Sequence, residues 1–318
     1  TFGGSGTPAT RKKRKKDALV YYVMGAPALF LFLAFYLYPA LQNLQFATRR
    51  WDGITEPENV GFRNFTNLLT NDDLFYKTLG NNIEFTFLVV LFQTTLALIF
   101  AVFLVKNTKT NIALRTLYFF PTILSSVSVG MIWLFLYDPN FGAINLFFNS
   151  IGLPSFALNW LGSESSALYA IAFSQVWFHT GQMMVVYIAG LQQIPKELYE
   201  SARLDGCNDF RLFTKIALPL SWPLISLLAF FAFIGNWANY FLPYILLPSS
   251  ENFTLPIGLG FLFYSTPAIN PGVGATSVPI YKPEIALAGV LIAVPIMIVF
   301  LISQKRLVRG MLAGSIKE

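Results

Sequence analysis

Residues 200–219 read ESARLDGCNDFRLFTKIALP, a charged stretch between two long apolar runs. The whole chain is 55% hydrophobic and only 12% charged, whereas soluble domains carry roughly a quarter charged residues. Because so few charges cannot cover a globular surface, the composition predicts an all-α integral membrane protein. The charged stretch is then expected to lie outside the bilayer, where another protein can contact it.

The apolar runs around this stretch predict the membrane spans. A spanning helix needs about 20 apolar residues. Six segments meet that length: 20–45, 83–105, 116–137, 167–193, 220–247 and 285–303. We expect 141–161, rich in Asn, Gly, Pro and Ser, to form an external loop with a short interfacial helix. The segment 252–281, rich in Gly and Pro, is expected to be a loop as well.

The basic residues predict the orientation. With both termini in the cytoplasm, 17 of the 22 Lys and Arg residues lie on the cytoplasmic side and 5 outside, which agrees with the positive-inside rule. The sequence thus predicts a disordered basic tail over 1–17, a transmembrane domain over 18–303 and a cytoplasmic tail over 304–318. The 194–219 segment joins the fourth and fifth expected spans in the cytoplasm.

Several classes of function are disfavoured by the composition. One cysteine and one histidine leave no set of residues for a metal cluster or a Ser/His/Asp triad. The chain contains no Gly-Lys pair, so the phosphate-binding loop of an ATPase is absent from it. Basic clusters sit beside apolar runs, which favours membrane orientation over nucleic-acid binding. We therefore expect no enzyme activity and no cofactor in this chain.

The 194–219 segment has the signals of two short helices. Pro195 suits the first turn of a helix, which we expect over 196–204. Gly206 allows a left-handed turn, and Asn208 or Asp209 can cap a second short helix through residue 215. The segment would then present an apolar ridge that can dock in a groove of a partner.

At this point the chain resembles the membrane subunits of binding-protein-dependent ABC importers, whose signature is Glu-Ala-Ala-x3-Gly-x9-Ile-x-Leu-Pro. The one departure is Ser201 at the second position. In that family the loop forms a coupling helix that docks in a cleft of the ATPase subunit. The resemblance implies that contact with the ATPase is made by Glu200, Ser201, Ala202, Asp205 and Gly206.

The resemblance extends over about residues 18–318. The stretches 61-GFRNF-65 and 191-LQQIP-195 look like the maltose- and glycerol-phosphate-type permeases of the sugar-importer branch. The implied partners are a second permease subunit, two ATPase subunits that bind ATP and Mg²⁺, an extracytoplasmic solute-binding protein and membrane lipid, with no nucleic acid. The implied location is the plasma (inner) membrane of a bacterium or archaeon, crossed several times.

Polar side chains inside the expected spans are candidates for a substrate path, because burying them in a membrane is costly. In the resembled permeases the matching stretches of the fourth and fifth helices line the sugar site. The candidates are Gln175, Phe178, His179, Gln182, Asn236, Asn239 and Tyr240. Amides and aromatic faces suit a neutral sugar, although such amides also serve to hydrogen-bond helices to one another.

The sequence thus predicts one permease subunit of an ATP-driven importer for a carbohydrate. Glycerol phosphate or another polyol is the alternative substrate, but an anion should require Arg or Lys facing the path, and none lies mid-span. A secondary transporter is the rival mechanism, yet it commonly needs an ionisable residue within a span. A membrane assembly or regulatory protein without transport activity is the third alternative.

Overall fold

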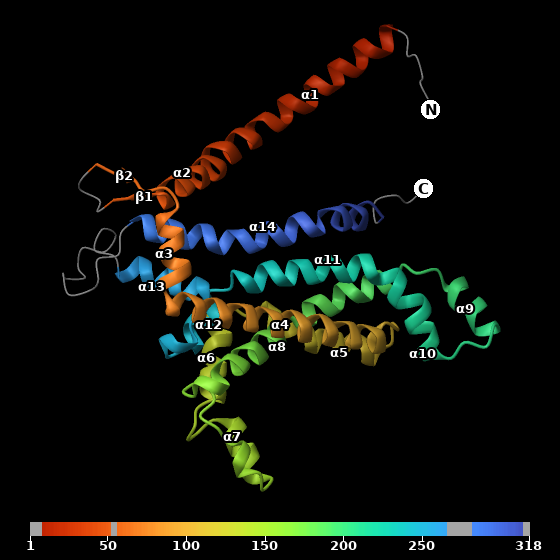
Figure 1. Cartoon of the computed structure of the whole chain (residues 1–318). Helices are drawn as coiled ribbons and strands as arrows, with labels where there is room; N and C mark the ends of the chain where they lie inside the picture. Colours follow the sequence, from red (N-terminus) through yellow and green to blue (C-terminus); the bar gives the residue numbers. More distant parts are fainter. Residues whose placement is uncertain (1–7, 52–55, 266–281, 314–318) are drawn as a thin grey trace. The chain divides into compact units, whose positions relative to one another are not determined.

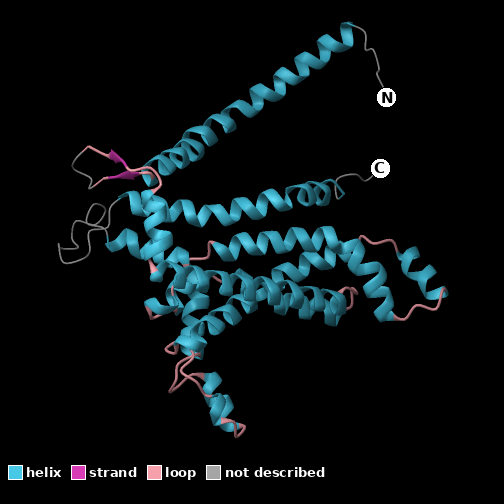
Figure 2. Ribbon diagram, in the orientation of Figure 1, coloured by secondary structure: helices cyan, strands magenta, loops and turns pink. Residues whose placement is uncertain are grey.

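The computed structural model describes residues 8–51, 56–265 and 282–313, and these are mostly helical (Figure 2). The chain divides into two compact units. Unit 1 comprises Thr1–Asn67 and Thr266–Val290, and unit 2 comprises Leu68–Ser265 and Leu291–Glu318.

Unit 1 contains the first expected span. Its helices are α1 (Pro8–Phe32), a π-helical turn η1 (Leu33–Leu37), α2 (Tyr38–Ala47) and the start of α3 (Arg63–Asn71). Strands β1 (Arg49–Arg50) and β2 (Glu58–Asn59) pair antiparallel, with Arg49 opposite Asn59. Asn64 fixes the hairpin because its Nδ2 donates to the carbonyls of Ala47 and Arg49, at 2.9 and 2.8 Å. The helix begins at Pro8, within the expected tail, while residues 1–7 lie outside the described residues.

Unit 2 contains the helices that form the core (Figure 1). In chain order, after the end of α3, the elements are α4 (Asp73–Leu104), α5 (Lys109–Phe119), η2 (Phe120–Ile123), α6 (Ser126–Leu136), α7 (Ala143–Ser150), η3 (Pro154–Phe156), α8 (Glu164–Leu191), α9 (Lys196–Leu204), α10 (Asp209–Leu212), η4 (Phe213–Ala217), α11 (Leu218–Trp237), α12 (Phe241–Leu246), η5 (Ser250–Asn252) and α13 (Leu255–Ser265). The last helix, α14 (Lys282–Ala313), begins in unit 1 and belongs to unit 2 from Leu291 onward. α8 packs along α4, and α11 packs against α4. Two clusters of buried apolar side chains lie along these contacts.

Four helices of the described part are long and apolar enough to cross a membrane. They are Val20–Ala47, Asp73–Leu104, Asp209–Trp237 and Pro283–Gln304. The bent pair Lys109–Ile123 and Ser126–Leu136 makes a fifth candidate if it forms one span. The 28-residue α8 is not among them, because side chains such as Gln175, His179 and Gln182 lower its mean hydropathy. The chain is a mostly helical membrane protein with four or five candidate spans, compared with the six expected.

The third expected span, 116–137, is not one continuous helix. Its two halves are bent by 100°. Pro121 lacks the N–H that would continue the helical ladder, and Leu124 is extended, with φ −72° and ψ 153°. Ser125 then starts α6 by accepting a hydrogen bond from the Ser128 amide at 3.1 Å. The polypeptide therefore turns sharply at a point where hydropathy alone predicted a straight helix.

The fifth expected span, 220–247, has different limits in the structure. Helix runs without a break from Asp209 to Trp237, because the charged residues in its first turns are compatible with helix. α12 is a separate short helix. The expected second helix of the 194–219 segment is α10, which continues through η4 into α11 without a break. The prediction of a capping residue is confirmed at Asn208, whose side chain accepts from the Arg211 amide at 2.9 Å.

Two loop predictions have different outcomes. A short helix within 141–161 is confirmed as α7. The prediction that 252–281 is a loop is wrong for its first part, where α13 forms despite two glycines and a proline. Pro256 sits in the first turn of α13, where its missing N–H breaks no helical hydrogen bond. Residues 266–281 lie outside the described residues.

Candidate functional site

A cavity of about 470 Å³ lies between the helices of unit 2. α8 contributes Gln175, Phe178, His179 and Gln182, and the α11 end contributes Asn236 and Asn239. Six of the seven side chains that the sequence indicated for a substrate path therefore meet at one cavity. They converge because residues three and four apart lie on the same face of a helix.

Hydrogen bonds join the two walls of this cavity. Gln175 Nε2 donates to Asn236 Oδ1 at 2.9 Å and also lies 3.2 Å from His179 Nδ1. Asn236 Nδ2 in turn donates to the Ala232 carbonyl at 2.7 Å. Gln175 and Asn236 are both buried, whereas Gln182 is exposed. The polar groups are thus held in place by one another across α8 and α11.

The rest of the cavity wall is apolar and partly aromatic. Phe178 lies against His179, with the two ring centroids 4.1 Å apart. On the other side, Phe231 and Leu228 of α11 line the cavity. None of the described side chains that line the cavity carries a formal charge. A wall of amides, a hydroxyl and ring faces can donate and accept hydrogen bonds with a neutral polar molecule while covering its apolar faces.

Tyr240 does not line the cavity. Its ring stacks on Tyr244 at 5.1 Å. It also covers Gly260, where an added Cβ would lie 2.7 Å from the Tyr240 ring. The helix ends at Trp237, and this changes the direction of the side chains that follow. The sequence predicted one helix over 220–247, and the direction of the Tyr240 side chain does not follow from such a helix.

Two further polar residues line the cavity although neither belongs to the predicted substrate-path set. Gln93 comes from α4 and Ser126 from the first turn of α6. Gln93 is a single amide in an apolar run, which is the same sequence feature that identified Gln175. Hydropathy describes α4 only as a span, and its contribution to the cavity follows from its packing against both α8 and α11.

The 194–219 segment forms a helix, a turn and a second helix. α9 ends at Leu204, and Gly206 adopts φ +81°, a left-handed conformation that favours glycine. Glu200, Ser201, Asp205 and Gly206 are exposed, and Ala202 is half-buried. Leu204 and Phe210 are 89% and 73% exposed, so large apolar side chains flank the turn and are left largely uncovered by the residues that the structure describes.

The inner side of the same segment is attached to the core. Tyr199 packs against the apolar cluster that includes Tyr187 and Ala217, and burial raises the pKa of the Tyr199 phenol. Arg203 forms an ion pair with Asp209 at 2.9 Å across the turn. The segment is thus a structured element with one packed side and one open side.

The root of the segment is tied to the connection between α4 and α5. Gln192, the residue after α8, donates through Nε2 to the Val105 carbonyl at 2.9 Å. Arg115 on α5 donates to the Leu104 carbonyl and to Asn107 Oδ1, each at 2.9 Å. These bonds satisfy carbonyl groups at the C-terminus of α4 that have no partner within the helix.

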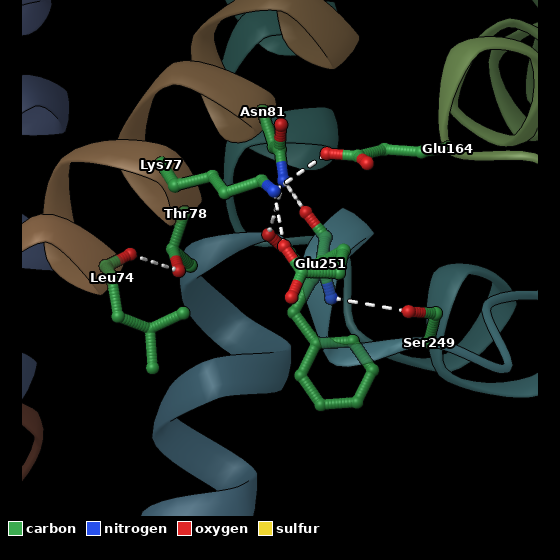
Figure 3. Close-up of polar contacts among 8 residues, drawn as sticks. Leu74, Lys77, Thr78, Asn81, Glu164, Ser249 and Glu251 are labelled. Atoms are coloured by element: carbon green, nitrogen blue, oxygen red, sulfur yellow. Dashed lines mark hydrogen bonds and ion pairs between the residues drawn. The ribbon is translucent and has the colours of Figure 1, made fainter.

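A charged cluster lies at the other end of α8 (Figure 3). The Lys77 ammonium on α4 contacts the carboxylates of Glu164 and Glu251. Asn81 adds hydrogen bonds to the carbonyls of Glu251 and Phe253, at 2.9 and 3.1 Å. The cluster connects the first turns of α4 and α8 to the turn η5.

Comparisons with known proteins agree with this arrangement. The family model described as the binding-protein-dependent transport system inner membrane component matches residues 93–313. The diacetylchitobiose uptake system permease protein NgcF of Streptomyces coelicolor is 35% identical over 222 residues, 66% of this chain and 62% of NgcF. The trehalose/maltose transport system permease protein MalF of Thermococcus litoralis is 32% identical over 218 residues, 68% of this chain and 72% of MalF.

A solved structure shares the fold. One chain of a bacterial alginate ABC transporter, crystallised with its alginate pentasaccharide-bound periplasmic protein, matches with a TM-score of 0.72. The match covers 93% of this chain and 97% of that chain at 23% identity. The family match, which includes the cavity helices and the 194–219 segment, confirms the predicted permease function and the multi-pass inner-membrane location. The chain belongs to the family of binding-protein-dependent transport system inner membrane components, and it is a permease component and not a catalytic subunit.

Proposed function

We propose that this chain forms half of the translocation path of an ATP-driven importer for a neutral carbohydrate. The observation that carries the proposal is the uncharged cavity lined by Gln175, His179, Gln182, Asn236 and Asn239. Such a wall pairs with hydroxyl groups, and Phe178 offers an apolar face to a sugar ring. The named substrates of NgcF and MalF, diacetylchitobiose and trehalose or maltose, support a carbohydrate.

The topology belongs to the same proposal. The chain crosses the membrane six times, with the bent α5–α6 pair as the third span, α8 as the fourth and both termini in the cytoplasm. At about 1.5 Å per residue, α8 is long enough for a hydrocarbon core about 30 Å thick. Its polar residues face the cavity, which explains how a helix of modest hydropathy can lie in a membrane. The transmembrane domain spans 18–303, between the terminal segments 1–17 and 304–318.

The 194–219 segment is the proposed contact with an ATPase subunit. Glu200, Ser201, Ala202, Asp205 and Gly206 form that contact on the open side of α9 and its turn. The remaining partners are a second permease subunit, a second ATPase subunit and an extracytoplasmic solute-binding protein that delivers the carbohydrate. Closure of the ATPase pair moves the segment, and its attachment to the core carries the movement to the cavity helices.

The substrate proposal is tested by uptake into vesicles that contain the complete transporter. We expect uptake of at least one of maltose, trehalose and diacetylchitobiose, and none of glycerol 3-phosphate, because no positive charge lines the cavity. Asn236→Ala should reduce that uptake about tenfold or more, since it removes a bridging amide. Tyr240→Phe serves as the control outside the cavity and should transport normally. Uptake of glycerol 3-phosphate alone would overturn the neutral-carbohydrate proposal.

The coupling proposal is tested at Gly206. Gly206→Glu should abolish uptake while leaving membrane insertion intact, because a bulky charged side chain would stand in the contact. Gly152 provides a matched control, since it also has a positive φ, +77°, with no atom within 4 Å of an added Cβ. Gly152→Glu introduces the same strain outside the segment and should retain uptake. Normal uptake by the Gly206 variant would refute the contact.

A further inference from the structure

We infer that Gln93 is a further specificity-determining residue. It forms a hydrogen bond with a hydroxyl group of the transported carbohydrate and acts together with Gln175. This inference rests on the proposed function of the cavity and names an additional helix, α4, as part of its selectivity. Gln93 on α4 and Gln175 on α8 each supply one amide group to the same cavity.

Burial and hydrogen bonding distinguish Gln93 from an ordinary packing residue. Its side chain is 5% exposed, yet it lines the cavity. Its carbonyl oxygen is buried and finds no hydrogen-bond donor among the described residues. A buried acceptor without a donor costs free energy, so this position favours a donor supplied from the cavity, either water or a hydroxyl group of a bound molecule that displaces it.

Gln175 also has a buried side-chain oxygen without a donor in the described part of the chain, and its amide group is held in one orientation. Its Nε2 is occupied by Asn236 Oδ1 at 2.9 Å, and its carbonyl oxygen is likewise buried without a donor among the described residues. Because the amide nitrogen is held, the oxygen cannot exchange places with it without breaking that bond. The Gln93 amide carries no such bond within the described part, and a terminal amide torsion is broad. Gln93 can therefore turn to accept from, or donate to, a hydroxyl.

The chemistry of a sugar fits two such amides. The hydroxyl groups of a sugar each donate one hydrogen and also accept, so different hydroxyls of one sugar can bond to the two amide groups. Two carbonyl oxygens do not favour a phosphate or carboxylate, which offers acceptors and negative charge. The two uncharged amides therefore favour a molecule that carries several hydroxyl groups, and neither supplies the positive charge that an anion would require.

The experiment compares Gln93→Met with the wild-type transporter in vesicles that hold the complete complex. Methionine keeps the length of glutamine without its polar atoms. The probes are whichever of maltose, trehalose and diacetylchitobiose the wild type takes up, and the monodeoxy derivatives of that sugar. We expect a KM about tenfold higher at nearly unchanged maximal rate, which corresponds to about 1.4 kcal/mol. We also expect that one deoxy derivative, discriminated against by the wild type, is no longer discriminated against by the variant.

Thr86→Val is the matched control. Thr86 lies seven residues before Gln93 on α4, is 2% exposed and has a buried oxygen with no hydrogen-bond partner among the described residues, but it does not line the cavity. This variant should keep the wild-type discrimination. Gln93→Leu repeats the test if the methionine variant does not assemble.

The outcomes separate the two proposals. If the wild type takes up glycerol 3-phosphate and none of the three sugars, the proposed function fails and this inference fails with it. If a sugar is taken up and both Gln93 variants discriminate against every deoxy derivative as the wild type does, only the inference fails. Gln93 is then a residue that packs α4 against its neighbours.

Discussion

Single residues decide how closely the core helices of unit 2 approach one another. A Cβ added at Gly181 on α8 would lie 1.9 Å from the Tyr118 carbonyl oxygen of α5. The conflicting atom belongs to the backbone, so no rotamer change can relieve it. Glycine at this position lets α8 and α5 pack backbone against backbone.

We therefore expect Gly181→Ala to separate α5 from α8 and to lower the free energy of unfolding by about 1–3 kcal/mol. The measurement is the thermal melting temperature of the purified protein in detergent. Gly80→Ala is the control, because a Cβ there meets no atom within 4 Å, and it should be neutral or slightly stabilising. An unchanged melting temperature for Gly181→Ala would show that the contact is looser than described.

The candidate site was largely predictable at this scale. Polar residues in apolar runs are costly, and this cost together with the resemblance to sugar permeases identifies Gln175 and Asn236 as candidates from the sequence. Tyr240 was misplaced because the end of α11 depends on the backbone at Ala238, which has φ −97° and ψ 13°. Gln93 gives the same local signal, an amide in an apolar run, but only the packing of α4 against α8 and α11 shows that it lines the cavity.

Among the helices, the ends and breaks were harder to predict than the apolar lengths. Hydropathy located the long helices, since burial of about 20 apolar residues does not depend on their neighbours. It missed the 100° bend between α5 and α6, which arises from Pro121 and the cap at Ser125. It also ended the fifth span at the wrong residues, because charged side chains do not stop a helix when its hydrogen bonds continue.

The Lys77 cluster gives a prediction at the scale of elements. Lys77→Met removes the ammonium that joins α4, α8 and η5, and it leaves Glu164 and Glu251 unneutralised near each other. These groups are more than a third exposed, so solvent screens them and the loss should be small. We expect a slightly lower melting temperature in dilute buffer, with the difference vanishing at about 1 M salt. Loss of stability that persists in high salt would indicate packing by the lysine stem instead.

For the whole molecule, the orientation in the membrane can be tested without adding a label site. Cys207 is the single cysteine of the chain and lies beside Gly206 in the 194–219 segment. We expect a membrane-impermeant maleimide to label it in inside-out vesicles and not in sealed right-side-out vesicles. Cys207→Ser should abolish labelling. Labelling from the outer side only would reverse the proposed orientation of both termini.

The unbroken helix from Asp209 to Trp237 also constrains the engineering of chimeras. Each residue of an α-helix advances it by about 100°. A single-residue insertion or deletion near η4 would therefore turn Asn236 away from Gln175 while leaving every local sequence motif intact. Grafts that borrow a docking segment from a relative should be joined at the turn around Gly206, where the backbone reverses, and keep the residue count beyond it. The docking segment and the cavity residue Asn236 thus lie on one continuous helix. Exchanging either part requires that the rotation of the helix between them be kept.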